Sequence, residues 1–147
     1  MEFIVIDQES PYYQQVLELR NRVLRIPLGL NLADEDLSEE KDQFTIVILK
    51  EEKVAASLML KVMGEGKLKL RQMVVDTPFQ KSGLGSILLG YAENFCLLNN
   101  YLDIELNARQ PAVGFYTKSG YSVVGDEFEE VGIPHVRMEK QLTLHKF

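Results

Sequence analysis

The sequence is poor in cysteine and histidine, lacks tryptophan and has no long apolar stretch. A single cysteine, Cys96, excludes an intrachain disulfide, so we expect a reducing, cytoplasmic setting. One cysteine and two histidines do not complete any recognisable zinc motif, so we expect no bound metal. The longest stretch without a charged residue covers only residues 82–92, whereas a membrane-spanning helix needs roughly 20 apolar residues. We therefore expect no membrane partner.

Positive charge is also scarce. The chain carries 16 Lys and Arg against 22 Asp and Glu, a formal net charge of −6. Binding to a phosphate backbone depends on a surplus of basic residues, so this balance argues against nucleic acid as a partner. With 147 residues and 46% apolar content the chain is long enough to bury a core, and we expect a single domain over residues 1–147.

Hydrophobic patterns predict an alternation of strands and helices. Alternating or β-branched runs predict strands over residues 3–6, 44–49, 54–62, 67–75, 102–107, 121–124 and 135–139. Apolar residues at spacings of three and four predict helices over residues 12–24 and 84–98, and Pro111 with Gly120 brackets a shorter helix over residues 111–119. The acidic residues 126–130 are expected to form a loop. This order is typical of an α/β or α+β sheet with helices on its faces.

Two of these segments are informative in detail. In the strand over residues 67–75 the alternation ends near Gln72, which indicates either that both faces become covered or that a bulge shifts the register there. The helix over residues 84–98 has the clearest helical period in the chain. Its expected buried stripe consists of Leu84, Ile87, Leu88, Tyr91, Phe95 and Leu98.

Residues 80–85 place two glycines between a predicted strand and this helix. Backbone N–H groups at a helix N-terminus form an anion site, to which a pyrophosphate would bind. The segment fits neither the dinucleotide pattern GxGxxG, since the next glycine is Gly90, nor the P-loop, since no Gly-Lys-Ser/Thr follows. From the two glycines alone, an anion site and an ordinary loop before a helix are about equally supported.

Three segments together resemble a known family, the GNAT superfamily of acetyl-CoA-dependent N-acetyltransferases. They are RQMVVD at residues 71–76, QKSGLG at residues 80–85 and FYTKSGY at residues 115–121. The order of predicted elements agrees with that family over nearly the whole chain. The resemblance implies a mixed, mostly antiparallel, twisted sheet of six to seven strands, flanked by about four helices, whose central strands splay apart.

The resemblance also implies acetyl-CoA as the cosubstrate. The backbone of Met73, Val74 and Val75 would pair with the pantetheine arm as an added strand does, and Asn107 would contact an amide of the arm. The pyrophosphate would bind to Gln80, Lys81, Ser82, Gly83, Leu84 and Gly85.

Two residues are candidates for proton transfer. Tyr116 matches the family's tyrosine that protonates the leaving coenzyme A sulfur, although its position on a short helix also suits an ordinary core residue. His135 is a candidate base for the incoming amine, since imidazole changes its charge near neutral pH, but a lone histidine on a strand is more often a hydrogen-bonded structural residue. Glu105 or a carboxylate that acts through water is another candidate. Cys96, beside a core residue in the long helix, is expected to be buried and inert, which favours direct transfer over an acyl-enzyme.

The sequence therefore predicts an acyltransferase that passes an acetyl group from acetyl-CoA to a primary amine in a ternary complex. The acceptor would be a small-molecule or peptide amine, and the protein a monomer or homodimer. The acidic residues 34–42 would either attract a cationic acceptor or form a solvated surface. The alternative function is a non-catalytic acyl-CoA-binding or sensor module.

Overall fold

The computed structural model describes residues 1–143, in which seven strands and three α-helices alternate. The helices are α1 (Tyr13–Arg20), α2 (Leu84–Leu98) and α3 (Gln110–Lys118). The strands are β1 (Glu2–Ile6), β2 (Phe44–Lys50), β3 (Lys53–Gly64), β4 (Lys67–Val75), β5 (Asp103–Arg109), β6 (Ser122–Glu130) and β7 (Ile133–Gln141). Five short 3₁₀ or π segments accompany them. About four helices were expected, and the described residues form three α-helices.

The strands form a mixed sheet in the order β1-β2-β3-β4-β5-β7-β6. The β1–β2, β2–β3, β5–β7 and β6–β7 pairs are antiparallel, whereas β4 and β5 are parallel, with residues 67–70 opposite residues 103–106. This mixed, mostly antiparallel sheet confirms the expected fold class. Divergence of β4 and β5 beyond these paired residues stays a prediction.

By its internal contacts the chain divides into two compact units. The first consists of Met1–Lys61 and Gln72–Ala92, and the second of Val62–Arg71 and the described chain from Glu93 onward. Both units contain part of β4 and part of α2. The expectation of one domain over residues 1–147 stays a prediction.

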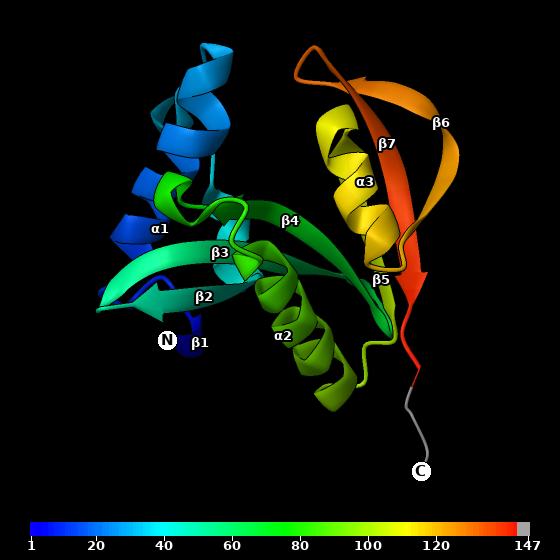
Figure 1. Cartoon of the computed structure of the whole chain (residues 1–147), viewed down its shortest axis with the longest axis horizontal. Helices are drawn as coiled ribbons and strands as arrows, with labels where there is room; N and C mark the ends of the chain where they lie inside the picture. The colour runs from blue at the N-terminus through cyan, green and yellow to red at the C-terminus, as the bar shows by residue number, and fades with distance from the viewer. Residues whose placement is uncertain (144–147) are drawn as a thin grey trace. The chain divides into compact units, whose positions relative to one another are not determined.

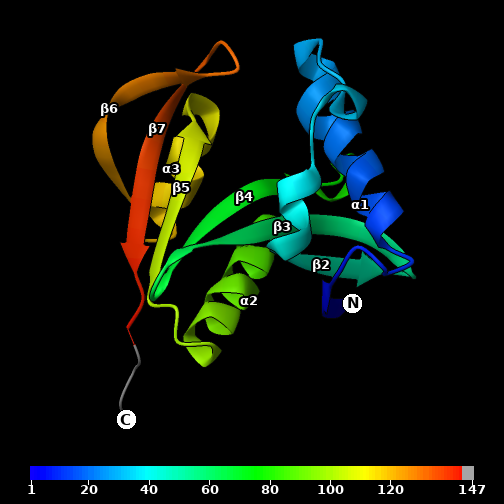
Figure 2. The same ribbon diagram turned by 180° about the vertical axis from the view of Figure 1, so that it is seen from behind.

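In the first unit, α1 and the first half of α2 lie on opposite faces of the strands (Figures 1 and 2). Val16 and Leu19 of α1 pack in one buried cluster with Val47 of β2, Val54 of β3 and Val74 of β4. The predicted helix over residues 12–24 is α1 followed by a π-helical turn, Asn21–Arg25. This turn carries Arg22 and Arg25.

Helix α2 has the predicted bounds, but its buried stripe differs from the expected one. Ile87 is 43% exposed and Leu98 is 80% exposed, so both were wrongly placed in the core. The buried residues instead recur every four positions and include small side chains: Leu84, Leu88, Ala92 and Cys96, with Leu89 beside them. A count of large apolar residues gives little weight to alanine and cysteine, which explains the error.

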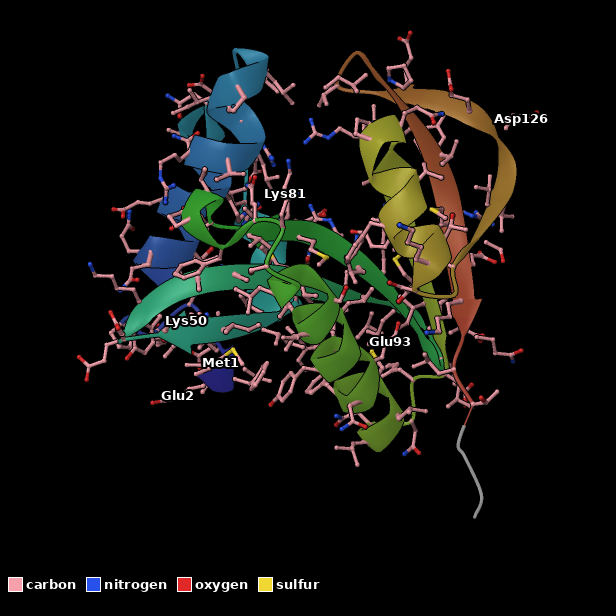
Figure 3. The ribbon with its side chains drawn as sticks, viewed as in Figure 1. Met1, Glu2, Lys50, Lys81, Glu93 and Asp126 are labelled. Carbon is pink, nitrogen blue, oxygen red and sulfur yellow. The ribbon has the colours of Figure 1, made fainter. Side chains whose placement is uncertain are left out.

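The second unit contains one correction of an element. The acidic residues 126–130 are not a loop, because β6 runs to Glu130 and pairs with β7 through residues 128–130 after an irregularity that follows Val124. Strand β6 is the last strand of the sheet order, so an outer edge faces solvent and tolerates acidic residues. Figure 3 shows Asp126 pointing outward from this strand.

Strand β4 resolves the alternatives left open at Gln72. The residue has φ = 54°, a left-handed backbone that a regular strand does not contain. Val74 is buried against α1, whereas Met73 and Val75 are half-buried. An irregularity of the bulge type, and not cover on both faces, therefore ends the alternation.

No helix within residues 1–143 is long and apolar enough to cross a membrane. Within the same residues, no three His, Cys, Asp or Glu side chains gather in a way that could hold a metal ion.

Candidate active site

The turn between β4 and α2 presents unpaired backbone donors. It begins as a 3₁₀ turn, Thr77–Phe79, which Asp76 caps by accepting a hydrogen bond from the amide of Thr77 at 2.8 Å. Within the described chain, no hydrogen-bond acceptor is paired with the amides of the following residues, Lys81, Gly83, Leu84, Gly85 and Ser86. We call residues 80–86 the anion-binding turn, after the role that the sequence predicts for them; that role stays a prediction.

Backbone conformation explains why these donors stay free. Lys81 and Gly83 have φ = 65° and φ = 84°, so the chain reverses direction just before α2. The first amides of α2 then have no helical carbonyl oxygen four residues earlier to donate to, which is the general state of a helix N-terminus. The helix dipole adds a partial positive charge at the same end. The turn thus has the chemistry of an anion site.

The side chains of the turn are placed differently from one another. Gln80 donates from Nε2 to the carbonyl oxygen of Val75 at 3.0 Å, and the Ser82 hydroxyl donates to the carbonyl of Phe79. Lys81 is exposed (Figure 3). Of the three polar side chains among the six predicted phosphate contacts, only that of Lys81 is charged, and it faces solvent from the turn.

Two arginines of the π-helical turn reach β4 and the residue after it. Arg22 donates from Nη1 to Oδ1 of Asp76 at 2.7 Å, and this pairing holds the pKa of the Asp76 carboxyl below its ordinary value. Arg25 donates from Nη2 to Oε1 of Gln72 at 3.0 Å and from Nε to Glu35 at 2.6 Å. Sequence reasoning gave these arginines no role. Their partners, Asp76 just after β4 and Gln72 within it, lie 54 and 47 residues away along the chain, and no local pattern reveals such pairs.

Tyr116 is buried in the second unit, at 8% exposure. It lies on α3 and meets Phe115 and Tyr121 edge-on, with ring centroids 5.1 and 5.7 Å away. Burial raises the pKa of Tyr116 to about 12. A phenol with the ordinary pKa of about 10 is already protonated at neutral pH, and burial favours this neutral form further.

A carboxylate on α2 organises the surroundings of this tyrosine. Glu93 accepts hydrogen bonds from the Tyr121 hydroxyl and from Nζ of Lys140, each at 2.9 Å (Figure 3). Lys140 also donates to the carbonyl of Ser119 at the end of α3, at 2.8 Å. These contacts fix the C-terminal end of α3, which is followed by Gly120 at φ = 94°.

His135 is buried on β7 with both ring nitrogens near acceptors. Nδ1 lies 2.8 Å from the carbonyl oxygen of Ile133, which can only accept, so Nδ1 carries the proton. Nε2 lies 3.5 Å from the Glu130 carboxylate, and the ring stacks on Phe128 at 6.0 Å. In the neutral imidazole the lone pair is therefore on Nε2.

Strand register separates the two candidate proton-transfer groups. Helix α3 covers the face of β7 that carries Lys140, and His135, five residues away, points to the other face. Asn107 of β5 is opposite Arg137, so it shares the face of His135. Tyr116 and His135 thus lie on opposite faces of the strand.

Glu105, the other candidate base, and Cys96, the only thiol, are both buried. Glu105 is buried and lies 3.4 Å from Nζ of Lys67. Cys96 is fully buried, and burial raises the pKa of its thiol to about 12. Such a thiol is a poor nucleophile at neutral pH, in agreement with the expectation of an inert cysteine.

Comparison with known proteins places this geometry in a family. Residues 30–142 match the family model described as an acetyltransferase (GNAT) domain. YyaT of Bacillus subtilis is 29% identical over 133 residues, which are 84% of this chain and 89% of that protein. The uncharacterized N-acetyltransferase YjcF, also of Bacillus subtilis, is 33% identical over 110 residues, which are 74% of this chain and 78% of its own.

Solved structures share the fold. Escherichia coli ElaA has a TM-score of 0.81 at 19% identity, over 95% of this chain and 99% of its own. An aminoglycoside 6'-N-acetyltransferase complexed with coenzyme A has a TM-score of 0.81 at 16% identity, over 100% of both chains. Sheet order, helices and family model together define an acyltransferase. The chain belongs to the GNAT family of N-acetyltransferases, which confirms the family and the enzyme class expected from the sequence.

Proposed function

We propose that the protein transfers an acetyl group from acetyl-CoA to a primary amine, by direct attack of the amine on the thioester in a ternary complex. The observation that carries the proposal is the set of unpaired amides in the anion-binding turn of a GNAT-family chain. Backbone donors at a helix N-terminus suit the diphosphate of coenzyme A, even in an acidic protein. A structural neighbour complexed with coenzyme A supports this cosubstrate.

In this proposal the turn binds one part of the cosubstrate and the end of β4 binds another. The amides of residues 81–86 and the Lys81 ammonium bind the diphosphate. The main chain of Met73, Val74 and Val75 pairs with the amides of the pantetheine arm, and Asn107 contacts one of those amides. Gln80 now donates to the Val75 carbonyl, so it has to release that carbonyl before the arm can bind there.

Tyr116 is the proposed proton donor to the departing sulfur. Its phenol is protonated at neutral pH, as any tyrosine is, and burial raises its pKa further, to about 12. A dry environment raises the pKa of a thiol as well, so the pKa values of the phenol and of the coenzyme A thiol stay close enough for a proton to pass between them. Orientation of both substrates supplies much of the remaining rate gain.

His135 is the proposed base for the amine, through the lone pair on Nε2. An ammonium with a pKa of about 10.4 must lose a proton before it can attack. The acid acts on the sulfur and the base acts on the amine nitrogen, which are different atoms. Both atoms are bonded to one carbon during the transfer, so the two roles require that carbon to lie within reach of both faces of β7.

A comparison of matched tyrosine variants tests the function. The wild type, Tyr116→Phe and the control Tyr101→Phe are assayed for release of coenzyme A with a broad panel of primary amines. We expect Tyr116→Phe to lose about 10²-fold to 10⁴-fold in kcat, the usual contribution of a positioned acid, and Tyr101→Phe to keep its activity. Equal activity of the three proteins contradicts the role of Tyr116.

Binding is measured separately by thermal unfolding. Acetyl-CoA at 100 times its Kd stabilises a fold by about 2.7 kcal/mol. For a chain of this length the melting temperature then rises by about 5–10 °C. A protein that shows this rise and acetylates none of the amines fits the sensor alternative. A protein that shows no rise has no acyl-CoA site.

A further inference from the structure

We propose that Arg22 and Arg25 are positioning residues that hold the two ends of the β4 segment whose main chain takes the acyl-CoA arm. Both come from the π-helical turn Asn21–Arg25, and their partners Gln72 and Asp76 lie on either side of Met73, Val74 and Val75. We call the two pairs the arginine clamp. The inference rests on the proposed function, since it assigns a purpose to the strand only if acetyl-CoA binds there.

Arg25 is the more rigid half of the clamp. Its guanidinium donates from Nε and Nη2 to the two carboxylate oxygens of Glu35, at 2.6 and 3.2 Å. This two-point contact fixes the plane of the guanidinium. The Arg25 side chain is only 13% exposed, so water competes little for its donors. The third contact, to Oε1 of Gln72 at 3.0 Å, is therefore made from a fixed position.

Gln72 needs such a contact because its backbone is strained. Its φ of 54° lies in the left-handed region, which residues other than glycine, asparagine and aspartate rarely adopt. Strained residues persist where the surrounding structure holds them, and they gather at ligand sites. The bond from Arg25 holds the side chain of Gln72 and so opposes relaxation of its backbone.

Asp76 fixes the other end of the segment. Its carboxylate accepts from Arg22 at 2.7 Å and from the amide of Thr77 at 2.8 Å. Its own amide donates to the carbonyl of Ala55 on β3 at 2.8 Å. The main chain of residues 73–75 is thus held between two anchored residues. Once Gln80 has released the carbonyl of Val75, an extended ligand that pairs with this main chain meets a backbone already held in position, which lowers the entropy cost of binding.

The test compares coenzyme A with its armless half, 3'-phospho-ADP, by calorimetry. In Arg25→Met we expect the affinity for coenzyme A to fall about tenfold, the fold-change that corresponds to one lost charge-assisted hydrogen bond. The affinity for 3'-phospho-ADP should stay unchanged, since that half does not touch residues 73–75. The control Lys53→Met removes an exposed cation of the same unit and should change neither affinity.

A second change at Gln72 separates positioning from general stability. Glycine adopts a positive φ without strain, so Gln72→Gly added to Arg25→Met should restore most of the coenzyme A affinity. Valine is β-branched and resists this conformation, so Gln72→Val should not restore it. Hydrogen exchange at the amides of residues 73–75 should be faster in Arg25→Met and in its valine double variant than in the wild type.

Three outcomes overturn the clamp. In the first, Arg25→Met binds coenzyme A as the wild type does. In the second, Arg25→Met loses affinity for both ligands equally, which shows a global effect on the fold. In the third, the wild type binds neither ligand; the proposed function then fails, and the clamp fails with it. The first two outcomes leave the proposed function intact.

Discussion

Replacement of Glu40 by glutamine tests how much the first unit depends on a buried charge pair. Arg20 at the end of α1 and Glu40 in the 3₁₀ segment Ser38–Asp42 are 1% and 5% exposed. The guanidinium donates from its two Nη atoms to the two oxygens of Glu40, at 2.8 and 2.9 Å. Nη1 of Arg20 also contacts the sulfur of Met59 at 3.5 Å, whereas Nε has no hydrogen-bond partner within the described chain.

The expected loss in the free energy of unfolding of Glu40→Gln follows from the burial and the geometry of the pair. Glutamine keeps one acceptor but removes the negative charge and turns an NH₂ group toward the guanidinium. Loss of one partner of a buried ion pair costs about 3–5 kcal/mol, because the other charge stays buried without compensation. At roughly 2–4 °C per kcal/mol for a chain of this length, the melting temperature should fall by about 6–20 °C.

Urea and thermal unfolding followed by circular dichroism measure this loss. Glu39→Gln is the control, since Glu39 is the exposed neighbour with the same change of charge. The double variant Arg20→Met with Glu40→Leu should recover most of the stability, because it removes both charges and refills the volume. A loss in Glu40→Gln no larger than that in Glu39→Gln would refute the reasoning.

Three further predictions concern the core and pH. Cys96 should not react with thiol reagents at pH 8 until the protein unfolds, because burial raises its pKa to about 12; absorbance with a disulfide reagent, with and without urea, checks this. Leu88→Ala should cost about 2–5 kcal/mol in urea unfolding and Leu98→Ala less than about 0.5, since Leu88 is fully buried and Leu98 is 80% exposed. The raised pKa of Tyr116 favours its neutral form in the fold, so the stability it contributes is complete below about pH 10 and is lost as pH rises toward 12. Urea midpoints in this range should fall less steeply in Tyr116→Phe than in the wild type.

The positions of most elements were predictable because each has a local signal. Strands with one wet face alternate, α2 has an apolar period, and α3 is bracketed by Pro111 and Gly120. The turn over residues 80–86 was predictable for the same reason, since glycines next to a helix start are visible in a short window, and its binding of an anion stays a prediction. What these signals describe is the conformation of neighbouring residues.

Errors occurred where the environment of an element, and not its local pattern, decides the outcome. Residues 126–130 look like a loop because they are acidic, yet an edge strand has one open side and accommodates them. Ile87 and Leu98 are apolar yet exposed, because Ala92 and Cys96 occupy the buried face of α2. The opposite faces of Tyr116 and His135 depend on which side of β7 α3 packs against, and the sequence does not contain that choice in any local form.

Left-handed backbone at a residue other than glycine was also beyond sequence reasoning, and two such residues lie in the candidate site. Gln72 and Lys81 have φ = 54° and φ = 65°, where a search for turns looks for glycine. At either position glycine would remove the strain, but it would also remove a functional group: the carboxamide that Arg25 holds, or the ammonium beside the free amides of the turn. A strained position that keeps a long polar side chain therefore indicates that the side chain contributes more than its backbone conformation costs. On this argument Gln72 and Lys81, and not Gly83, are the residues to replace first.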